Sequence, residues 1–235
     1  MNTKHRSEEP EIMDDFNMEG KMLKTSLDNI AWINRILGGN KPILKAIKRL
    51  YLQSHKTDII SITDIGCGNG DMLRALASMG RKESINMKLK GIDANDYTIS
   101  YGKELSVPYP EIEFDCKNIL DPDFKMPICD IILFTLTLHH FSDEEILILL
   151  SRANKSARLA VIINDLQRSK IPYLLFGWLS YIFNMVEMNK KDGKTSILRG
   201  FKRRELKKYA EKLQFKNYSI QWKWAFRYQW IISKL

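Results

Sequence analysis

The sequence predicts a doubly wound α/β fold, in which helices cover both faces of a mostly parallel sheet. Apolar, β-branched runs alternate with segments of helical periodicity, a glycine-rich turn follows the first run, and two alternating segments lie close together near the C-terminus. Near-continuous apolar strands separated by helices are typical of a parallel sheet buried on both faces. With 235 residues and 44% hydrophobic content, the chain is long enough to bury such a core.

Two helices are expected before the first strand. The segment 22–39 has apolar residues at helical spacing and ends at Gly38-Gly39, and a second helix begins at Lys41 with Pro42 in its first turn. We expect residues 1–55 to form an N-terminal helical cap and residues 56–235 to form the main domain. The apolar positions of the first helix are Leu23, Leu27, Ile30, Ile33 and Leu37.

Five apolar runs are predicted as the parallel strands, and a final pair as an antiparallel hairpin. The hairpin segments, 216–224 and 227–235, alternate with period two and have no helix between them, so they close one edge of the sheet. Helices are expected after the glycine turn and over 97–105 and 143–154. The parallel strands are expected at 58–65, 85–93, 112–116, 129–138 and 157–166.

The net charge of +9 is concentrated between residues 199 and 216. The apolar positions of this stretch keep helical spacing, which favours a solvated face of an amphipathic helix over a nucleic-acid surface. The three cysteines, Cys67, Cys116 and Cys129, lack metal-ligand spacing and are expected to be reduced, and no metal site is predicted. The polar start and the lack of a 20-residue apolar span predict a cytoplasmic protein.

The glycine turn predicts a cofactor site. Gly66, Gly68 and Gly70 follow the first strand at its carboxyl end, where α/β sheets bind ligands and where a helix N-terminus begins. A dinucleotide fingerprint would place its third glycine where this chain has Asp71, and a pyrophosphate would be a poor neighbour of Asp64. S-adenosylmethionine has a sulfonium, an ammonium group and no phosphate, and it therefore suits Asp64 better.

The run TDIGCGNGDML resembles motif I of the class I S-adenosylmethionine-dependent methyltransferases, and the resemblance extends over nearly the whole chain. It implies a Rossmann-like, seven-stranded, mostly parallel sheet with an antiparallel C-terminal hairpin strand. It also implies that Asp93 binds both ribose hydroxyls, and that Asn118 stands where the family usually has an Asp for the adenine amino group. The full set of implied cofactor contacts is Asp64, Gly66, Cys67, Gly68, Gly70, Asp93, Ala94, Asn118, Ile119, Phe134 and Thr135.

Further resemblances concern the acceptor. The run LTLHHF resembles small-molecule enzymes of quinone and polyketide tailoring, and the chain lacks the N/D-P-P-Y/F tetrapeptide of adenine amino-group modifiers. The segments RSEEPEIMDD, INRILGGNKPIL, NDLQRSKIPYLLF and DGKTSILRGFKRREL resemble a bacterial subgroup found beside type III polyketide synthases. That resemblance implies secondary metabolism and an alkylated phenol or related polyketide as acceptor.

Residues 171–186 have no charge and five aromatic side chains, and they follow the fifth strand within a lid expected at about 168–198. Three interpretations stay open for this segment. It packs against Trp32 and the N-terminal helices, it covers an aromatic or alkyl substrate, or its basic flanks bring it to an acidic lipid surface. The flanking residues are Arg168, Lys170, Lys190 and Lys191.

A phenol acceptor would need a base, because its pKa is about 10 when unperturbed. His139 and His140 follow the fourth strand, and we favour His140, although either residue could instead have a structural role. Methyl transfer to oxygen is favoured over carbon. A non-catalytic cofactor-binding module, a nucleic-acid methyltransferase and a nucleotide-dependent oxidoreductase remain as alternatives, and the oligomeric state stays open. Further candidate acceptor contacts are Asp165, Arg168, Tyr173 and Arg199.

Overall fold

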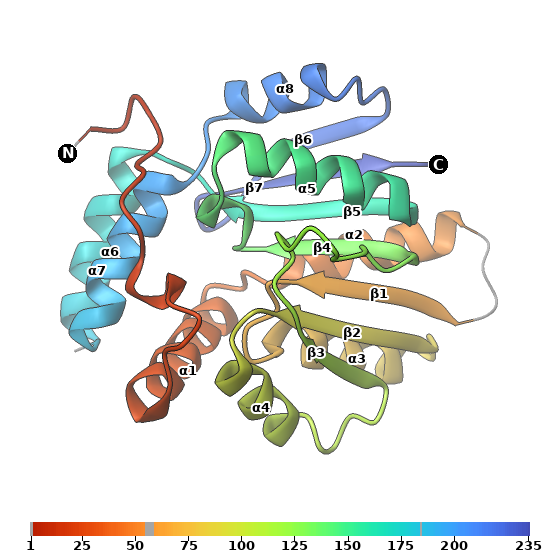
Figure 1. Cartoon of the computed structure of the whole chain (residues 1–235), viewed down its shortest axis with the longest axis horizontal. Coiled ribbons are helices and arrows are strands. Elements are labelled where there is room, and N and C mark those ends of the chain that lie inside the picture. Colours follow the sequence, from red (N-terminus) through yellow and green to blue (C-terminus); the bar gives the residue numbers. More distant parts are fainter. Residues whose placement is uncertain (1, 55–58, 184) are drawn as a thin grey trace.

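The computed structural model describes residues 2–54, 59–183 and 185–235. Within these ranges, seven strands form one sheet in the order β3-β2-β1-β4-β5-β7-β6 (Figure 1). Strands β1 to β5 pair in parallel, and β7 pairs antiparallel with both β5 and β6. The strands are β1 (Ile60–Ile65), β2 (Met87–Asp93), β3 (Ile112–Cys116), β4 (Cys129–Thr135), β5 (Ala157–Leu166), β6 (Tyr218–Lys223) and β7 (Arg227–Ser233). The predicted fold class is confirmed.

The helices follow the predicted periodicity, with local signals at several ends. Asn95 caps α4 by accepting a hydrogen bond from the Thr98 backbone N–H, and Ser142 and Glu145 form a capping box at the start of α5. The helices are α1 (Gly20–Ile36), α2 (Lys41–Gln53), α3 (Asp71–Glu83), α4 (Asp96–Leu105), α5 (Asp143–Ser156), α6 (Lys170–Ile182), α7 (Glu187–Arg199) and α8 (Arg203–Lys212), with short 3-10 turns η1 (Ile12–Asp14) and η2 (Leu138–His140).

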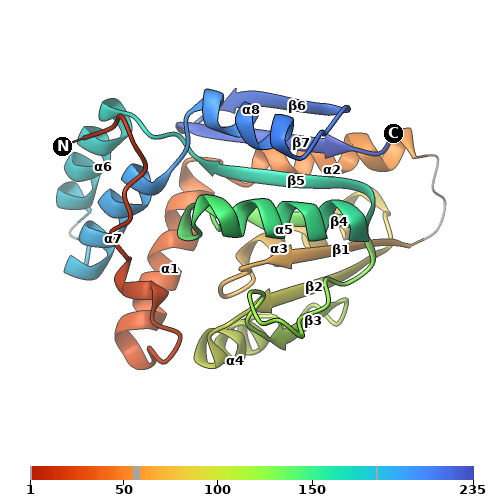
Figure 2. The same ribbon diagram turned by 45° about the horizontal axis from the view of Figure 1, so that its top comes forward.

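The two faces of the sheet carry separate hydrophobic cores. Helices α2 and α3 pack on one face, and α5 and α8 pack on the other. Helices α1, α6 and α7 gather with the N-terminal segment at one end of the sheet, beyond the carboxyl ends of the parallel strands (Figure 2). The extra elements therefore cover the edge at which α/β sheets bind ligands.

Several boundaries differ from the sequence-based expectations; the strand expected at 129–138, for example, ends at Thr135. The basic stretch 199–216 is not one helix, because α7 ends at Arg199 and α8 spans only Arg203–Lys212. The predicted lid consists of two packed helices, α6 and α7. The predicted domain boundary at 55/56, the first residue of the strand expected at 58–65 and position 184 of the apolar segment lie outside the described residues.

Candidate functional site

The glycine turn is built so that side chains are excluded from it. Gly66 follows β1 with φ +67°, and a Cβ at this position would lie 2.4 Å from Cγ2 of Thr137. Gly70 is the N-cap of α3 with φ +78°, and a Cβ there would lie 2.6 Å from the ring of Phe114. Both positions therefore require glycine, because of the left-handed backbone and because of the close neighbour.

Two carboxylates flank this turn. Asp93 ends β2, where Oδ2 accepts a hydrogen bond from the Gly68 N–H at 2.9 Å and Oδ1 accepts one from the Asn95 N–H at 3.1 Å. Asp64 is buried in β1, and its Oδ1 has no hydrogen-bond partner among the described residues. Burial and the nearby charge of Asp93 raise the pKa of Asp64 to about 8. A cationic group of a ligand would lower this pKa and be balanced by the ionised Asp64, whereas a phosphate would be repelled by it.

The other predicted cofactor residues lie around the same edge, with two differences. Phe134 is fully buried in the α5 side of the core, because strand alternation turns its side chain to the face opposite Asp64. Only its backbone is left to face a cofactor. Oδ1 of Asn118 accepts a hydrogen bond from the Leu120 N–H at 3.0 Å, so the expected acceptor oxygen stabilises a turn. Cys67 and Ile119 are buried, Thr135 is half-buried, and the Ala94 carbonyl oxygen lies 3.5 Å from the Cys116 sulfur.

The histidines are connected to the glycine turn through the chain between β4 and η2. The Thr137 hydroxyl donates to the Ile65 carbonyl oxygen at 3.0 Å, directly beside Gly66. Leu136 has φ +55°, a left-handed conformation that a branched side chain rarely adopts. The constrained turn places His139 and His140 next to the predicted cofactor site.

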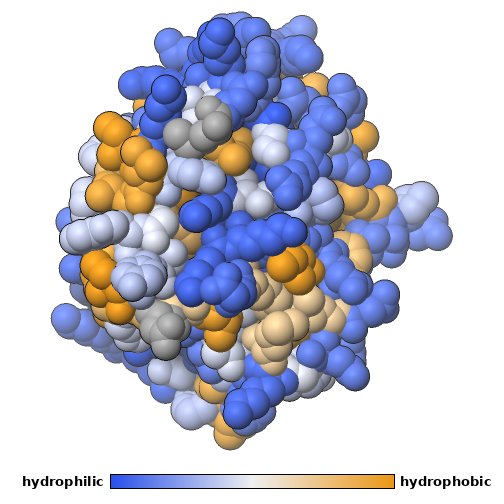
Figure 3. All heavy atoms as spheres, turned by 90° about the vertical axis from the view of Figure 1, so that its left-hand side faces the viewer, coloured by the Kyte–Doolittle hydropathy of each residue, from blue (hydrophilic) through white to orange (hydrophobic). Residues whose placement is uncertain are grey.

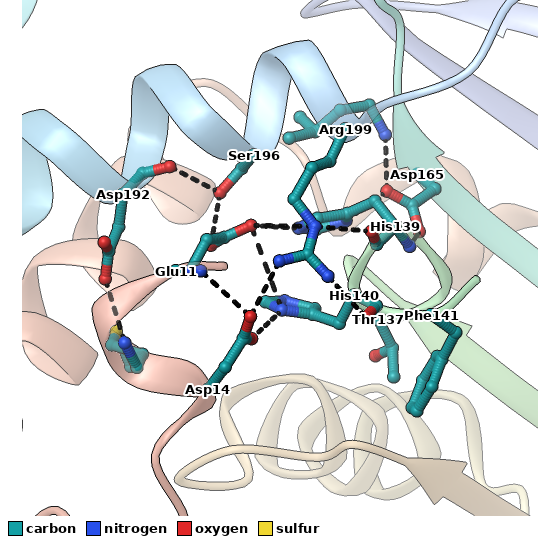
Figure 4. Close-up of polar contacts among 12 residues, drawn as sticks. Glu11, Asp14, Thr137, His139, His140, Phe141, Asp165, Asp192, Ser196 and Arg199 are labelled. Atoms are coloured by element: carbon teal, nitrogen blue, oxygen red, sulfur yellow. Dashed lines mark hydrogen bonds and ion pairs between the residues drawn. The ribbon is translucent and has the colours of Figure 1, made fainter. Parts of the chain in front are cut away.

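His139 is buried and held by β5. Its Nδ1 lies 2.7 Å from Oδ1 of Asp165, and its Nε2 lies 3.5 Å from Oε1 of Glu11 (Figure 4). Although burial opposes the change, the charge and hydrogen bond of His139 lower the pKa of Asp165. Asp165 is thus used to orient His139, and the structure shows no free carboxylate oxygen there for an acceptor.

His140 is the more accessible of the two histidines. Its Nδ1 lies 2.6 Å from Oδ1 of Asp14, while its Nε2 makes no hydrogen bond within the described part of the chain. The other oxygen of Asp14 accepts from Nη1 of Arg199 at 2.7 Å. Burial again opposes the change, but the hydrogen bond and charge of His140 lower the pKa of Asp14. Arg199 also donates to the carbonyl oxygens of His139 and His140, so it fixes the whole turn.

Glu11 and Asp14 come from residues 3–16, which we call the N-terminal strap. The strap crosses the carboxyl edge of the sheet, and Asp192 of α7 accepts hydrogen bonds from its Ile12 and Met13 N–H groups at 2.8 and 3.1 Å. Oε2 of Glu11 accepts from the Ser196 hydroxyl at 2.6 Å, and burial raises the pKa of Glu11 to about 7. Sequence reasoning missed both acids. The only signal for them was the acidic cluster in RSEEPEIMDD.

Donor atoms of Glu11, His139 and His140 lie within 4.8 Å of one another, a spacing that suits a metal ion. However, Nδ1 of each histidine already contacts a carboxylate, and Nε of Arg199 lies 4.0 Å from Oε1 of Glu11. A guanidinium cation therefore occupies the neighbourhood that a metal would need. We describe the group as a network of hydrogen bonds and ion pairs.

Arg168 and Tyr173 differ from their predicted roles. Four of the five N–H donors of Arg168 donate within the protein, to the carbonyl oxygens of Thr3, Lys4 and Gly200 and to Glu205, and the side chain is buried. These contacts give Arg168 a structural role, and its contact with an acceptor stays a prediction. Tyr173 lies on α6, with its ring 5.8 Å from the Lys194 ammonium of α7. Because α7 packs against η1 and η2 while α6 packs mainly on α7, Tyr173 belongs to the outer layer.

Comparison with known proteins agrees with the glycine turn and its surroundings. Residues 62–158, which span β1 to the start of β5, match a family model described as a methyltransferase domain. None of the curated proteins matches the chain in sequence.

Solved structures share the architecture. The plantazolicin methyltransferase BpumL in complex with SAH has 18% identity and a TM-score of 0.65, over 91% of this chain and 89% of that one. The plantazolicin methyltransferase BamL has 16% identity and a TM-score of 0.65, over 90% and 91%. The magnesium protoporphyrin IX methyltransferase ChlM from Synechocystis PCC 6803 has 14% identity and a TM-score of 0.55, over 94% and 87%. The predicted fold is confirmed, and residues 62–158 are similar to a methyltransferase domain.

Proposed function

We propose that this chain transfers a methyl group from S-adenosylmethionine to a small, largely apolar aromatic acceptor, and that oxygen is methylated in preference to carbon. The observation that carries the proposal is the pair of carboxylates at the glycine turn, of which Asp64 is buried and Asp93 is half-buried. Asp64 has an unsatisfied oxygen there, and Asp93 lies where a ribose would be bound. When bound, the cofactor supplies an electrophilic methyl carbon.

Several parts of the chain would hold this cofactor. Asp93 would accept from ribose hydroxyls, because a carboxylate has lone pairs beyond the two that accept from Gly68 and Asn95. Asp64 would balance a positive group, and the buried Ile119 would cover the adenine. The N-terminal turn of α3 would offer backbone N–H groups at the same edge.

His140 is the proposed proton acceptor for a phenolic oxygen. Asp14 contacts its Nδ1 and so fixes the tautomer that leaves Nε2 as the acceptor, as a carboxylate does for histidine in hydrolase triads. The proton of the acceptor hydroxyl would move to Nε2 while the oxygen attacks. Arg199 donates to the His140 carbonyl oxygen and so holds the turn that carries this histidine.

Calorimetric titration with S-adenosylmethionine, S-adenosylhomocysteine and NAD tests the cofactor. We expect binding of the two sulfur compounds and none of NAD, whereas binding of NAD alone would support the oxidoreductase. A panel of alkylphenols, matched with methyl ethers that block the hydroxyl, then tests the acceptor through release of S-adenosylhomocysteine. Turnover of the ethers at the rate of the phenols would indicate carbon methylation, and cofactor binding without any turnover would support a binding module.

The role of His140 is tested with His140→Ala and with His5→Ala as control, because the His5 side chain is exposed and lies outside the network. Loss of a general base lowers turnover by roughly 100- to 10,000-fold. We expect that loss for His140→Ala with unchanged cofactor affinity, and full activity for His5→Ala. If cofactor affinity and turnover of His140→Ala fell together, the residue would be structural.

A further inference from the structure

Helix α6 carries an apolar stripe that faces solvent. Steps of three and four residues along a helix return to the same face, and six large apolar or aromatic residues of α6 follow such steps. Each of them is between 44% and 81% exposed: Ile171, Leu174, Leu175, Trp178, Tyr181 and Ile182. A helix on a globular protein normally turns such a stripe toward the core.

The opposite side of α6 attaches it to the protein. Pro172 and Ser180 are its buried residues, and the ring of Phe176 lies so close to Gly193 of α7 that a Cβ there would meet it at 2.2 Å. Figures 1 and 2 show α6 at the periphery, with α7 beside it and the sheet further inside. The orientation of the stripe is therefore fixed by a tight contact between the two helices.

The patch continues onto α1. Phe183 follows α6 and packs edge-on against Trp32, with ring centroids 5.0 Å apart, and both side chains remain more than a third exposed. Ile36, one helical turn beyond Trp32, is also exposed. Figure 3 shows hydrophobic side chains gathered along one side of this end of the molecule. Monomeric soluble proteins rarely expose apolar patches of this extent without a binding role.

The charges around the patch are mostly positive. Lys170 begins α6, and α7 contributes Lys190, Lys191 and Lys194, while Glu187 is the one exposed acid of these two helices in the described residues. Four lysines against one glutamate give this rim a net charge of +3. Asp192, the remaining carboxylate of α7, is buried and accepts hydrogen bonds from the N-terminal strap.

We propose that the α6 face docks onto an anionic lipid bilayer, with the helix lying in the plane of the interface. An apolar face rimmed by lysine, with Trp178 and Tyr181 on it, combines the features that hold interfacial helices at headgroup level. A second copy of the chain would bring two rims of +3 together, whereas acidic headgroups complement the rim. No described helix is long and apolar enough to cross a membrane, so the contact is peripheral. The proposal does not depend on the identity of the acceptor.

Sedimentation with lipid vesicles tests this docking on the full chain, without acceptor or cofactor. We expect binding to phosphatidylcholine vesicles that contain 30 mol% phosphatidylglycerol, and weak binding to phosphatidylcholine alone. The Leu174→Asp/Trp178→Asp variant should lose at least about tenfold in partitioning. The matched control is Val107→Asp/Ile128→Asp, which places the same charges at two exposed apolar positions away from α6 and should bind as the native chain does.

A second pair of variants addresses the charge. Lys170→Glu/Lys191→Glu leaves the apolar stripe intact and should reduce binding to anionic vesicles by about fivefold or more for each lysine changed. Thermal melts of all variants show whether they fold. Equal binding of the α6 variant and its control would overturn the proposal. The proposal would also be overturned if the native chain did not bind anionic vesicles and instead formed a concentration-dependent dimer in light scattering, and if the α6 variant no longer formed that dimer.

Discussion

Glu11→Gln tests whether the N-terminal strap buries an acid over the histidines in solution. The substitution keeps the size of the side chain and an oxygen for the Ser196 hydroxyl, which donates to Glu11 at 2.6 Å. It removes only the ability to ionise. Any pH-dependent difference in stability between the two proteins therefore reports the titration of Glu11.

The structure fixes the sign and scale of that difference. Burial raises the pKa of Glu11 from 4.5 to about 7 in the folded state. Between pH 4.5 and 7 the folded chain keeps a proton on Glu11 that the unfolded chain has released. The free energy of unfolding therefore falls as the pH rises through this range, and the whole loss is present above pH 7. The shift is about 2.5 pH units, so at about 1.4 kcal/mol for each unit the cost is at most roughly 3.5 kcal/mol, and Glu11→Gln avoids it.

The assay is urea unfolding of both proteins from pH 4.5 to 8.5. We expect similar free energies of unfolding at the acid end and a variant more stable by roughly 2 to 3 kcal/mol at the alkaline end. The depressed pKa of Asp14 contributes an opposite pH dependence, but it is present in both proteins and largely cancels in the difference. A difference that stays constant across this range would refute the reasoning, because Glu11 would then ionise as an exposed acid does.

Two further substitutions separate site geometry from general stability. Gly66→Ala should reduce stability and cofactor affinity together, because this position has a positive φ and a Cβ there would lie 2.4 Å from Thr137. The control is Gly177→Ala on α6, where a Cβ would meet only the flexible Lys194 side chain at 3.4 Å. Thermal melts should show this control to be as stable as the native chain or more stable. Arg168→Met should lower the free energy of unfolding by about 3 to 5 kcal/mol, since it leaves Glu205 without its ion-pair partner. If the variant kept native stability but had a higher KM for the acceptor, the predicted substrate contact of Arg168 would be supported instead.

The sheet was predictable because its signals are local. The apolar runs, the glycines at 66, 68 and 70 and the period-two alternation of the C-terminal hairpin each encode their own element, and together they fix the order of the strands in the chain. Asp64 and Asp93 could be placed at the carboxyl edge for the same reason, since strand ends in a parallel sheet share one edge.

The contacts around the histidines were not predictable in this way. Glu11 and Asp14 lie more than 120 residues from His139 and His140, on a segment without helical or strand periodicity. Arg168 looked like a free cation beside the site, but its burial depends on backbone carbonyls of the N-terminal strap and on Glu205. Hydrogen bonds to backbone carbonyls leave no signature in residue type.

The N-terminal strap is held mainly by polar contacts, and this decides how an acceptor would reach the histidines. Its described ties include the ion pair of Asp14 with Arg199, the hydrogen bond from Ser196 to Glu11, and the two N–H groups received by Asp192. Neither main core cluster includes a residue of the strap, and Met13 packs only against the small cluster beside α1. Segments with few buried apolar contacts open locally at a free energy well below that of global unfolding. Opening would expose His140 and carry Asp14 away from it, so the base would be oriented only when the strap has closed again. A closed strap over a bound acceptor would therefore both exclude water and restore the Asp14–His140 contact that the proposed proton transfer needs.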